Sequence, residues 1–314
     1  MKRKTGILLF VFLMVICTAA LADVSINKKH FPDKAFREYV LQFDTDGNRV
    51  LSDAEIAAVT EIELFMREDI ASVQGVEYFT ALTRLECYYM GLTELDVSRN
   101  TALTELTVSY NKLKKLDVSR NAKLRVLLCE YNELTKLDVS HNPYLYFFSC
   151  TRNPLKKLDV SGNPDLIRLD CVSCGLKSLD VSRQTGLTEL YADYNKLTKL
   201  DLSKNTCLKT LNCNGNKLKK LNLSKNTLLE KVECSGNNLT VLTLGKHPKL
   251  AFLHAYGNPL KKLDVRQCKI LNKLVKTKKY GDAKPYGEGW KSKPIPGGYK
   301  ILLTVNRTVK VITQ

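Results

Sequence analysis

The stretch from Leu208 to Leu221, "LKTLNCNGNKLKKL", contains most of one period of a repeat that governs much of the chain. Its last leucine opens the triplet Leu-Asn-Leu, and a related triplet, usually Leu-Asp-Val, recurs every 21 residues. The triplets begin at Leu95, Leu116, Leu137, Leu158, Leu179, Leu200, Leu221, Leu242 and Leu263. Nine copies without an insertion indicate stacked units, because a single unit of this size cannot bury its apolar side alone.

The full unit reads L-x-x-L-x-C-x-x-N-x-L-x-x-L-D-V-S-x-N-x-x, which resembles the leucine-rich repeat signature with cysteine in an apolar position of the strand. We predict a leucine-rich repeat solenoid, a curved β-solenoid of 21-residue repeats, with one strand per coil on the concave face. The L-D-V-S segment should form a second strand-like stretch opposite. A second apolar column supports this phase: Leu85, Leu106, Leu127, Phe148, Leu169, Leu190, Leu211, Val232, Leu253 and Leu274.

The cysteines follow the same repeat. Six of them share one strand position with Val108, Ala192 and Ala255, so the position takes a small buried group and its thiols should be reduced. They are Cys87, Cys129, Cys150, Cys171, Cys213 and Cys234. Cys174 falls instead in the asparagine column, so Cys171-Val-Ser-Cys174 is a crossing of two columns and not a metal or redox pair.

The two ends of the chain differ from the repeat. Residues 1–22 read as a secretory signal peptide, with three cations, an apolar core and Ala20-Leu21-Ala22 as the cleavage site. Residues 23–80 should form a small α-helical, EF-hand-like N-terminal cap with a divergent first repeat, followed by repeats over 81–275. Residues 276–314 should form a linker and a short β C-terminal cap, in which residues 299–314 make a hairpin.

A loop in the N-terminal cap resembles a calcium-binding EF-hand loop. Its ligands would be Asp44, Asp46, Asn48, the carbonyl of Val50, and Glu55, which also forms a capping box with Ser52. Arg49 stands where the sharp turn favours glycine, so the alternative is a cap that keeps this shape without an ion.

Residues 81–275 are similar to bacterial surface leucine-rich repeats with a cysteine ladder, of the internalin J type. The blocks that carry the resemblance are Leu124–Asn132, Leu145–Asn153 and Leu208–Asn216, each followed by L-D-V-S or a close variant. The resemblance implies a secreted or cell-surface protein, and adhesion to a protein or glycan ligand through the concave face. It also implies a cap that holds its EF-hand-like shape without an ion.

The composition favours binding over catalysis. The formal charge of +17 points, in a secreted protein, first to anionic surfaces and not to nucleic acid; the alternative is that it serves only solubility. We expect no enzyme, because the four histidines are scattered without a motif, and no transmembrane segment after signal cleavage. A calcium-dependent docking module is an alternative, although only one such loop is present.

A basic flank offers a further alternative. Its lysines either neutralise the aspartates of L-D-V-S or bind anionic cell-wall polymers. They are Lys114, Lys115, Lys136, Lys156, Lys157, Lys199, Lys219, Lys220, Lys261 and Lys262.

The predicted ligand-binding residues lie beside the inward-facing leucine and cysteine of each strand. Aromatic residues with an arginine among them are typical of binding surfaces. The predicted set is Tyr88, Tyr89, Tyr110, Leu128, Tyr131, Phe147, Arg168, Tyr191, Tyr194, Phe252, His254 and Tyr256.

Overall fold

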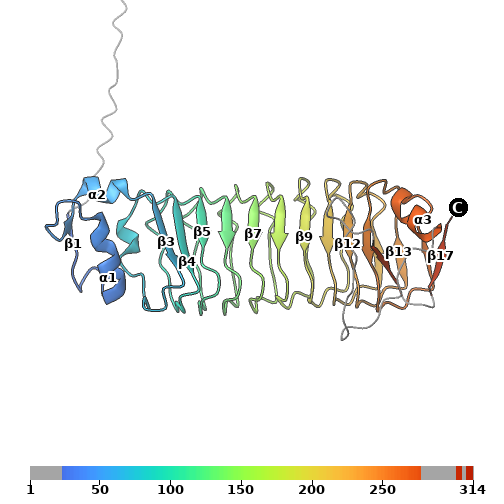
Figure 1. Ribbon diagram of the computed structural model, residues 1–314, viewed down its shortest axis with the longest axis horizontal. Helices are drawn as coiled ribbons and strands as arrows, with labels where there is room; N and C mark the ends of the chain where they lie inside the picture. The colour runs from blue at the N-terminus through green and yellow to red at the C-terminus, as the bar shows by residue number, and fades with distance from the viewer. Residues whose placement is uncertain (1–22, 277–301, 306–308, 314) are drawn as a thin grey trace, which may run out of the picture.

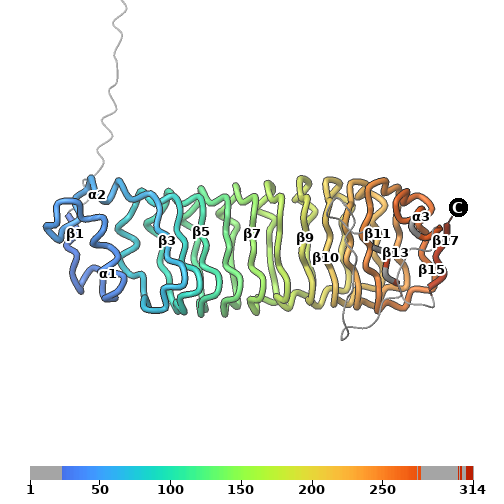
Figure 2. The backbone as a smooth tube through the Cα atoms, in the orientation of Figure 1, coloured from blue at the N-terminus to red at the C-terminus, as the bar shows by residue number. Residues whose placement is uncertain are grey.

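The structure is a computed structural model that describes residues 23–276, 302–305 and 309–313. It is an elongated solenoid with helices at its N-terminal end and one helix near its C-terminal end (Figure 1). Successive coils lie side by side along the long axis (Figure 2), and strands β3–β10, β12, β14 and β16 form a single parallel sheet in that order. This confirms the predicted leucine-rich repeat architecture.

The sheet keeps the 21-residue register that the sequence predicts. Leu106 pairs with Leu127, and Leu211 pairs with Val232, so inward residues of successive coils stack on one another. The inward side chains are fully buried, while those on either side face the concave surface. The strands are β3 (Glu61–Phe65), β4 (Arg84–Tyr88), β5 (Glu105–Thr107), β6 (Val126–Leu128), β7 (Phe147–Ser149), β8 (Arg168–Asp170), β9 (Glu189–Tyr191), β10 (Thr210–Asn212), β12 (Lys231–Glu233) and β14 (Phe252–His254).

The predicted strand on the opposite side is regular only near the C-terminal end. It comprises β11 (Lys220–Asn222), β13 (Val241–Thr243) and β15 (Lys262–Asp264). In most coils the stretch is short because the Asp or Asn side chain closes a turn. Asp117 Oδ1, for example, accepts a hydrogen bond from the Ser119 N–H at 2.9 Å.

The N-terminal cap contains β1 (Val24–Ser25), α1 (Lys34–Val40), the 3₁₀ helix η1 (Leu41–Phe43), β2 (Val50–Leu51) and α2 (Asp53–Ala58); η2 (Val76–Tyr78) belongs to the first coil. Asp33 caps α1 by accepting from the Phe36 N–H at 2.9 Å, and its other oxygen accepts from the Ala71 N–H at 2.9 Å. One carboxylate therefore both starts the helix and ties the cap to the first coil.

The C-terminal end differs from the prediction in two ways. Leu274, expected in a strand, lies in helix α3 (Lys269–Lys276). The predicted hairpin is also wrong: β16 (Leu302–Thr304) pairs with β14, and β17 (Lys310–Ile312) pairs with β15, both in parallel. The free edges of β14 and β15 offer separate templates on the two sides of the solenoid, so the segment adds one more strand to each side and covers both edges.

The cysteines behave as the repeat predicts. All six in the strand position are free and buried, and so is Cys174. Burial raises the pKa of Cys87 and of Cys234 to about 12. Cys268 is buried as well, and among the cysteines that the structure describes only Cys207 is partly exposed.

Two asparagine ladders fix the spacing of the coils. Asn132 donates from Nδ2 to the Val108 carbonyl at 2.9 Å, and its Oδ1 accepts from the Leu113 N–H at 3.0 Å. On the other side, Asn142 donates to the carbonyls of Val118 and Asn121 at 3.0 and 2.9 Å. Each buried amide thus satisfies backbone groups of the preceding coil.

Candidate functional site

Aromatic rings form a continuous row across the first coils of the concave face. The rings of Phe65 and Tyr88 are parallel with centroids 5.0 Å apart, and Tyr88 lies 5.2 Å from Tyr110. Tyr110 stacks on Tyr131 at 4.2 Å, and the Arg152 guanidinium lies 5.2 Å from the Tyr131 ring centre. We call these five residues the aromatic strip.

One edge of this strip has an unusual backbone. Tyr110, Tyr131 and Arg152 have φ of 58°, 53° and 55°, in the left-handed region that favours glycine. The same column continues every 21 residues and ends in three glycines. Its members are Tyr89, Tyr110, Tyr131, Arg152, Ser173, Tyr194, Gly215, Gly236 and Gly257. The chain therefore keeps large side chains in the first coils at positions where later coils use glycine.

A second cluster occupies the middle of the concave face. The Arg168 guanidinium lies 4.8 Å from the ring centres of both Phe147 and Tyr191. It pairs with Asp170 at 2.8 Å and with Glu189 at 3.3 Å, and the Tyr191 hydroxyl donates to Glu189 at 3.1 Å. Burial raises the pKa of Asp170 and raises that of Tyr191 to about 12. The charge of Arg168 is thus balanced by two carboxylates. Its guanidinium covers one face of the Phe147 ring and one face of the Tyr191 ring.

A third cluster lies toward the C-terminal coils. Lys231 lies 5.2 Å from the Phe252 ring centre, and the rings of Phe252 and His254 are 4.3 Å apart. Lys231 pairs with Glu233 at 2.7 Å. Burial lowers the pKa of His254, and the carboxylate of Glu233 opposes that shift.

The predicted binding residues therefore fall into these three clusters, with four exceptions. Leu128 and Tyr256 are half-buried in the same columns. Tyr89 lies beside the strip, 6.0 Å from Tyr110, and Tyr194 is exposed on the rim. The sequence prediction missed Phe65, which is 60% exposed, because it belongs to the divergent first coil where the repeat phase is not visible.

The EF-hand-like loop brings its carboxylates together: oxygens of Asp44, Asp46 and Glu55 lie within 4.8 Å of one another. Carboxylate and amide oxygens are of the type that calcium prefers. The loop also supplies its own partners. Glu55 accepts from the Thr45 N–H at 2.6 Å and from the Ser52 N–H at 2.9 Å, and Asp44 accepts from the Arg49 N–H at 2.8 Å.

The shape of this loop is supported from both sides. Val50 lies in β2, which pairs with β1, and Arg49 adopts the left-handed conformation with φ of 63°. Hydrogen bonds from Thr45 and Ser52 lower the pKa of Glu55 to about 2. The hydrogen-bond donors that hold the loop in this shape therefore belong to the chain itself.

The lysines of the basic flank are all exposed. Among the described residues none of these lysines forms an ion pair with an aspartate of the L-D-V-S column. Those aspartates accept backbone N–H groups instead, as Asp138 does from Ser140 at 2.9 Å.

The 21-residue coils, the asparagine ladders and the buried cysteine column define a leucine-rich repeat solenoid with a cysteine ladder. The chain is similar to the functional domain of InlJ from Listeria monocytogenes, which includes a cysteine ladder: TM-score 0.75, 38% identity, covering 80% of this chain and 56% of that domain. It is also 40% identical over 71 residues to Internalin J of Listeria monocytogenes serotype 4b.

These matches cover part of each relative's length. The 71 residues amount to 22% of this chain and 8% of the curated Internalin J, and the chain spans about half, 56%, of the solved InlJ domain. An internalin of Listeria monocytogenes, InlF, shares the fold with a TM-score of 0.63 at 18% identity, over 95% of this chain and 94% of its own. No protein-family model matches the chain. Across the described residues, no helix is long and apolar enough to cross a membrane.

Proposed function

We propose that this is a secreted or surface-held bacterial protein that binds a protein ligand on its concave face. The likeness to internalin solenoids and the signal-peptide pattern of residues 1–22 support this role. The observation that carries the proposal is the aromatic strip, because a row of partly exposed rings on a rigid sheet has the composition of a binding hot spot.

The geometry of the strip favours a protein over a glycan. Sugars pack on the exposed faces of aromatic rings, but here Tyr110 and Arg152 cover the two faces of Tyr131. Tyr131 therefore presents its ring edge and phenol hydroxyl, which suit the mixed apolar and polar contacts of a protein interface. The Arg168 cluster extends this surface with two rings that each have the Arg168 guanidinium over one face.

The backbone supports the same assignment. A left-handed conformation costs a residue with a side chain about 1 kcal/mol or more relative to glycine. The fold accepts glycine in this column at Gly236 and Gly257. Retaining tyrosine at positions 89, 110 and 131 is therefore unfavourable for the backbone, and such strain gathers at functional sites.

The test begins with pull-downs from host and bacterial surface extracts, beside a glycan array. For a captured protein, Tyr131→Ala and Tyr191→Ala should each weaken binding by roughly 1–3 kcal/mol without unfolding the solenoid. Tyr144→Ala, outside the concave face, should leave that affinity unchanged. Unchanged affinity in both concave variants would refute the proposal.

The basic flank is a second candidate surface, for anionic cell-wall polymers. It is favoured by one observation: its exposed lysines are not paired with the neighbouring aspartates in the described coils. Retention on immobilised teichoic acid at low salt, lost when Lys114, Lys115 and Lys136 become glutamate, would support it. Absence of retention at low salt would exclude it.

A further inference from the structure

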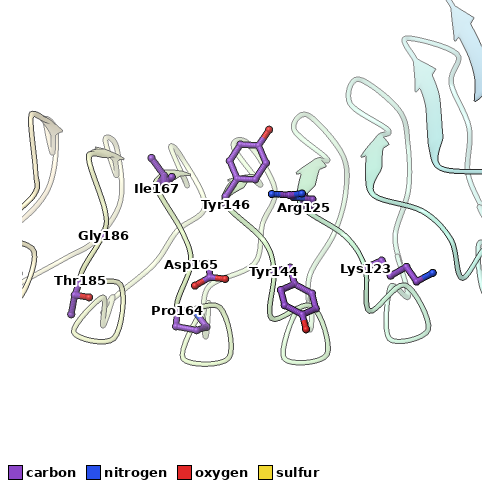
Figure 3. A pocket seen from close by; sticks show the side chains of 9 residues that line it. All are labelled: Lys123, Arg125, Tyr144, Tyr146, Pro164, Asp165, Ile167, Thr185 and Gly186. Atoms are coloured by element: carbon purple, nitrogen blue, oxygen red, sulfur yellow. The ribbon is translucent and has the colours of Figure 1, made fainter.

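A groove of about 870 Å³ lies where the chain enters strands β6 to β9 (Figure 3). Three exposed apolar side chains line it: Tyr144, Tyr146 and Ile167, which are 60%, 39% and 47% exposed. Lys123, Arg125 and Asp165 line it as well. We call these six residues the entry groove; none of them belongs to the predicted concave set.

The solenoid does not require aromatic residues here. In the column of Tyr144, other coils carry Ala81, Ala102 and Gly186. In the column of Tyr146, other coils carry Thr83, Thr104 and Thr188. Small residues therefore suffice for stacking, and the two tyrosines add an apolar surface that the fold leaves open to solvent.

The charged groups of the entry groove are unpaired. Within the described part of the chain, Lys123, Arg125 and Asp165 form no ion pair, and the Arg125 guanidinium lies 5.8 Å from the Tyr146 ring centre. Arg125 thus stands beside Tyr146, Lys123 lies at the end of the groove with its amine directed away from Tyr144, and a single carboxylate lies farther along (Figure 3). The cationic end is complementary to a negatively charged group.

The backbone of the groove offers little to a peptide. The Tyr146 N–H donates to the Arg125 carbonyl and the Ile167 N–H to the Tyr146 carbonyl, each at 2.9 Å. Strands β6 to β9 each have a neighbour on both sides, so no free edge is available for an added strand. Recognition must rely on side chains alone.

We propose that the entry groove binds a carboxylate-bearing sugar chain, of the uronic acid type. Unlike Tyr131, Tyr144 has no ring stacked on it among the described residues, so its faces can pack against the C–H side of a sugar ring. Arg125 can hold the sugar carboxylate through paired hydrogen bonds, with Lys123 adding charge. This site is separate from the aromatic strip, so either can fail without the other.

The experiment titrates the mature protein with a hexamer of galacturonic acid at low salt, by calorimetry. Its matched neutral probe is the methyl-esterified hexamer. Tyr144→Ala and Arg125→Thr copy residues that other coils carry in the same columns, so both variants should fold. The control variants are Tyr131→Ala on the concave face and Lys28→Gln with Lys29→Gln, two exposed lysines of the N-terminal cap.

The expected result is that the acidic hexamer binds, and that each groove variant weakens binding at least tenfold. The ester should bind clearly more weakly, and both control variants should bind like the original protein. The proposal is overturned if the acidic hexamer does not bind, if its ester binds equally well, or if the lysine control variant loses as much affinity as the groove variants. It is also overturned if a polyglutamate peptide or a polyglycerol phosphate, which lack sugar rings, binds as tightly as the hexamer.

Discussion

Replacing Tyr131 by glycine should give a more stable protein than replacing it by alanine, which reverses the usual order. Tyr131 has φ of 53°. Alanine keeps that left-handed strain, which costs about 1–2 kcal/mol, whereas glycine relieves it. Relative to alanine, glycine also lowers the folding stability by about 0.4–1 kcal/mol, because it gives the unfolded chain more conformational freedom. The difference should favour glycine by roughly 1 kcal/mol.

Both variants lose the same contacts. The stack on Tyr110 contributes about 0.5–1.5 kcal/mol, and the Arg152 guanidinium about 0.5–1 kcal/mol. Tyr131→Ala should therefore be destabilised by roughly 1–2.5 kcal/mol, and Tyr131→Gly by about 1 kcal/mol less. The assay is urea unfolding followed by circular dichroism, comparing midpoints at equal slope.

Tyr88 provides the matched control. It carries a similar ring stack but lies at the end of strand β4 and is not in the left-handed region. Tyr88→Gly should be less stable than Tyr88→Ala by about 0.5–1 kcal/mol. If Tyr131→Gly is also less stable than Tyr131→Ala by that amount, the argument that the left-handed backbone at Tyr131 is strained is refuted.

Three further predictions concern buried and capping groups. In native protein at pH 8, a thiol reagent should modify Cys207 alone among the nine cysteines described, because the others are buried; rapid reaction of a second one would contradict this. Hydrogen bonds hold the pKa of Glu55 near 2, so the stability that its carboxylate contributes is present above about pH 4.5 and is lost as pH falls toward 2. In the Glu55→Gln variant, folding stability measured by NMR should depend less on pH over this range. EDTA should shift the melting temperature little at pH 7. His247 stands where the second ladder otherwise carries asparagine, and its ring nitrogens approach the backbone of Asn226 and Leu223 without reaching the geometry of a good hydrogen bond. His247→Asn should therefore stabilise by about 1 kcal/mol in urea unfolding, while Asn226→His should destabilise.

The repeat made most of the fold predictable. Because the period is 21 residues throughout, Leu106 and Leu127 had to stack, and the exchange of cysteine with Ala192 placed the thiols in the core. The C-terminal segment was not predictable in this way. Its alternating pattern specifies strands but not their partners, and β16 and β17 pair with β14 and β15 instead of each other.

The candidate site was predictable in composition but not in geometry. Column positions indicated that Tyr110, Tyr131 and Arg168 share one face, and the structure places them there. Which rings stack depends on side-chain rotation, and the left-handed backbone was visible only as Gly215, Gly236 and Gly257 at the same spacing. The entry groove was missed because Tyr144 and Tyr146 lie outside the columns beside the inward leucine and cysteine.

The most direct test of a concave protein-binding face is site-specific photo-crosslinking. A photoreactive phenylalanine at position 131 would lie in the aromatic strip, and the same residue at position 136 would replace an exposed lysine of the basic flank. After incubation with surface extracts, position 131 should give a discrete crosslinked protein that persists when the extract is deglycosylated. Position 136 should not give it. Crosslinking of the same partner from position 136 alone, or its loss on deglycosylation, would contradict the account.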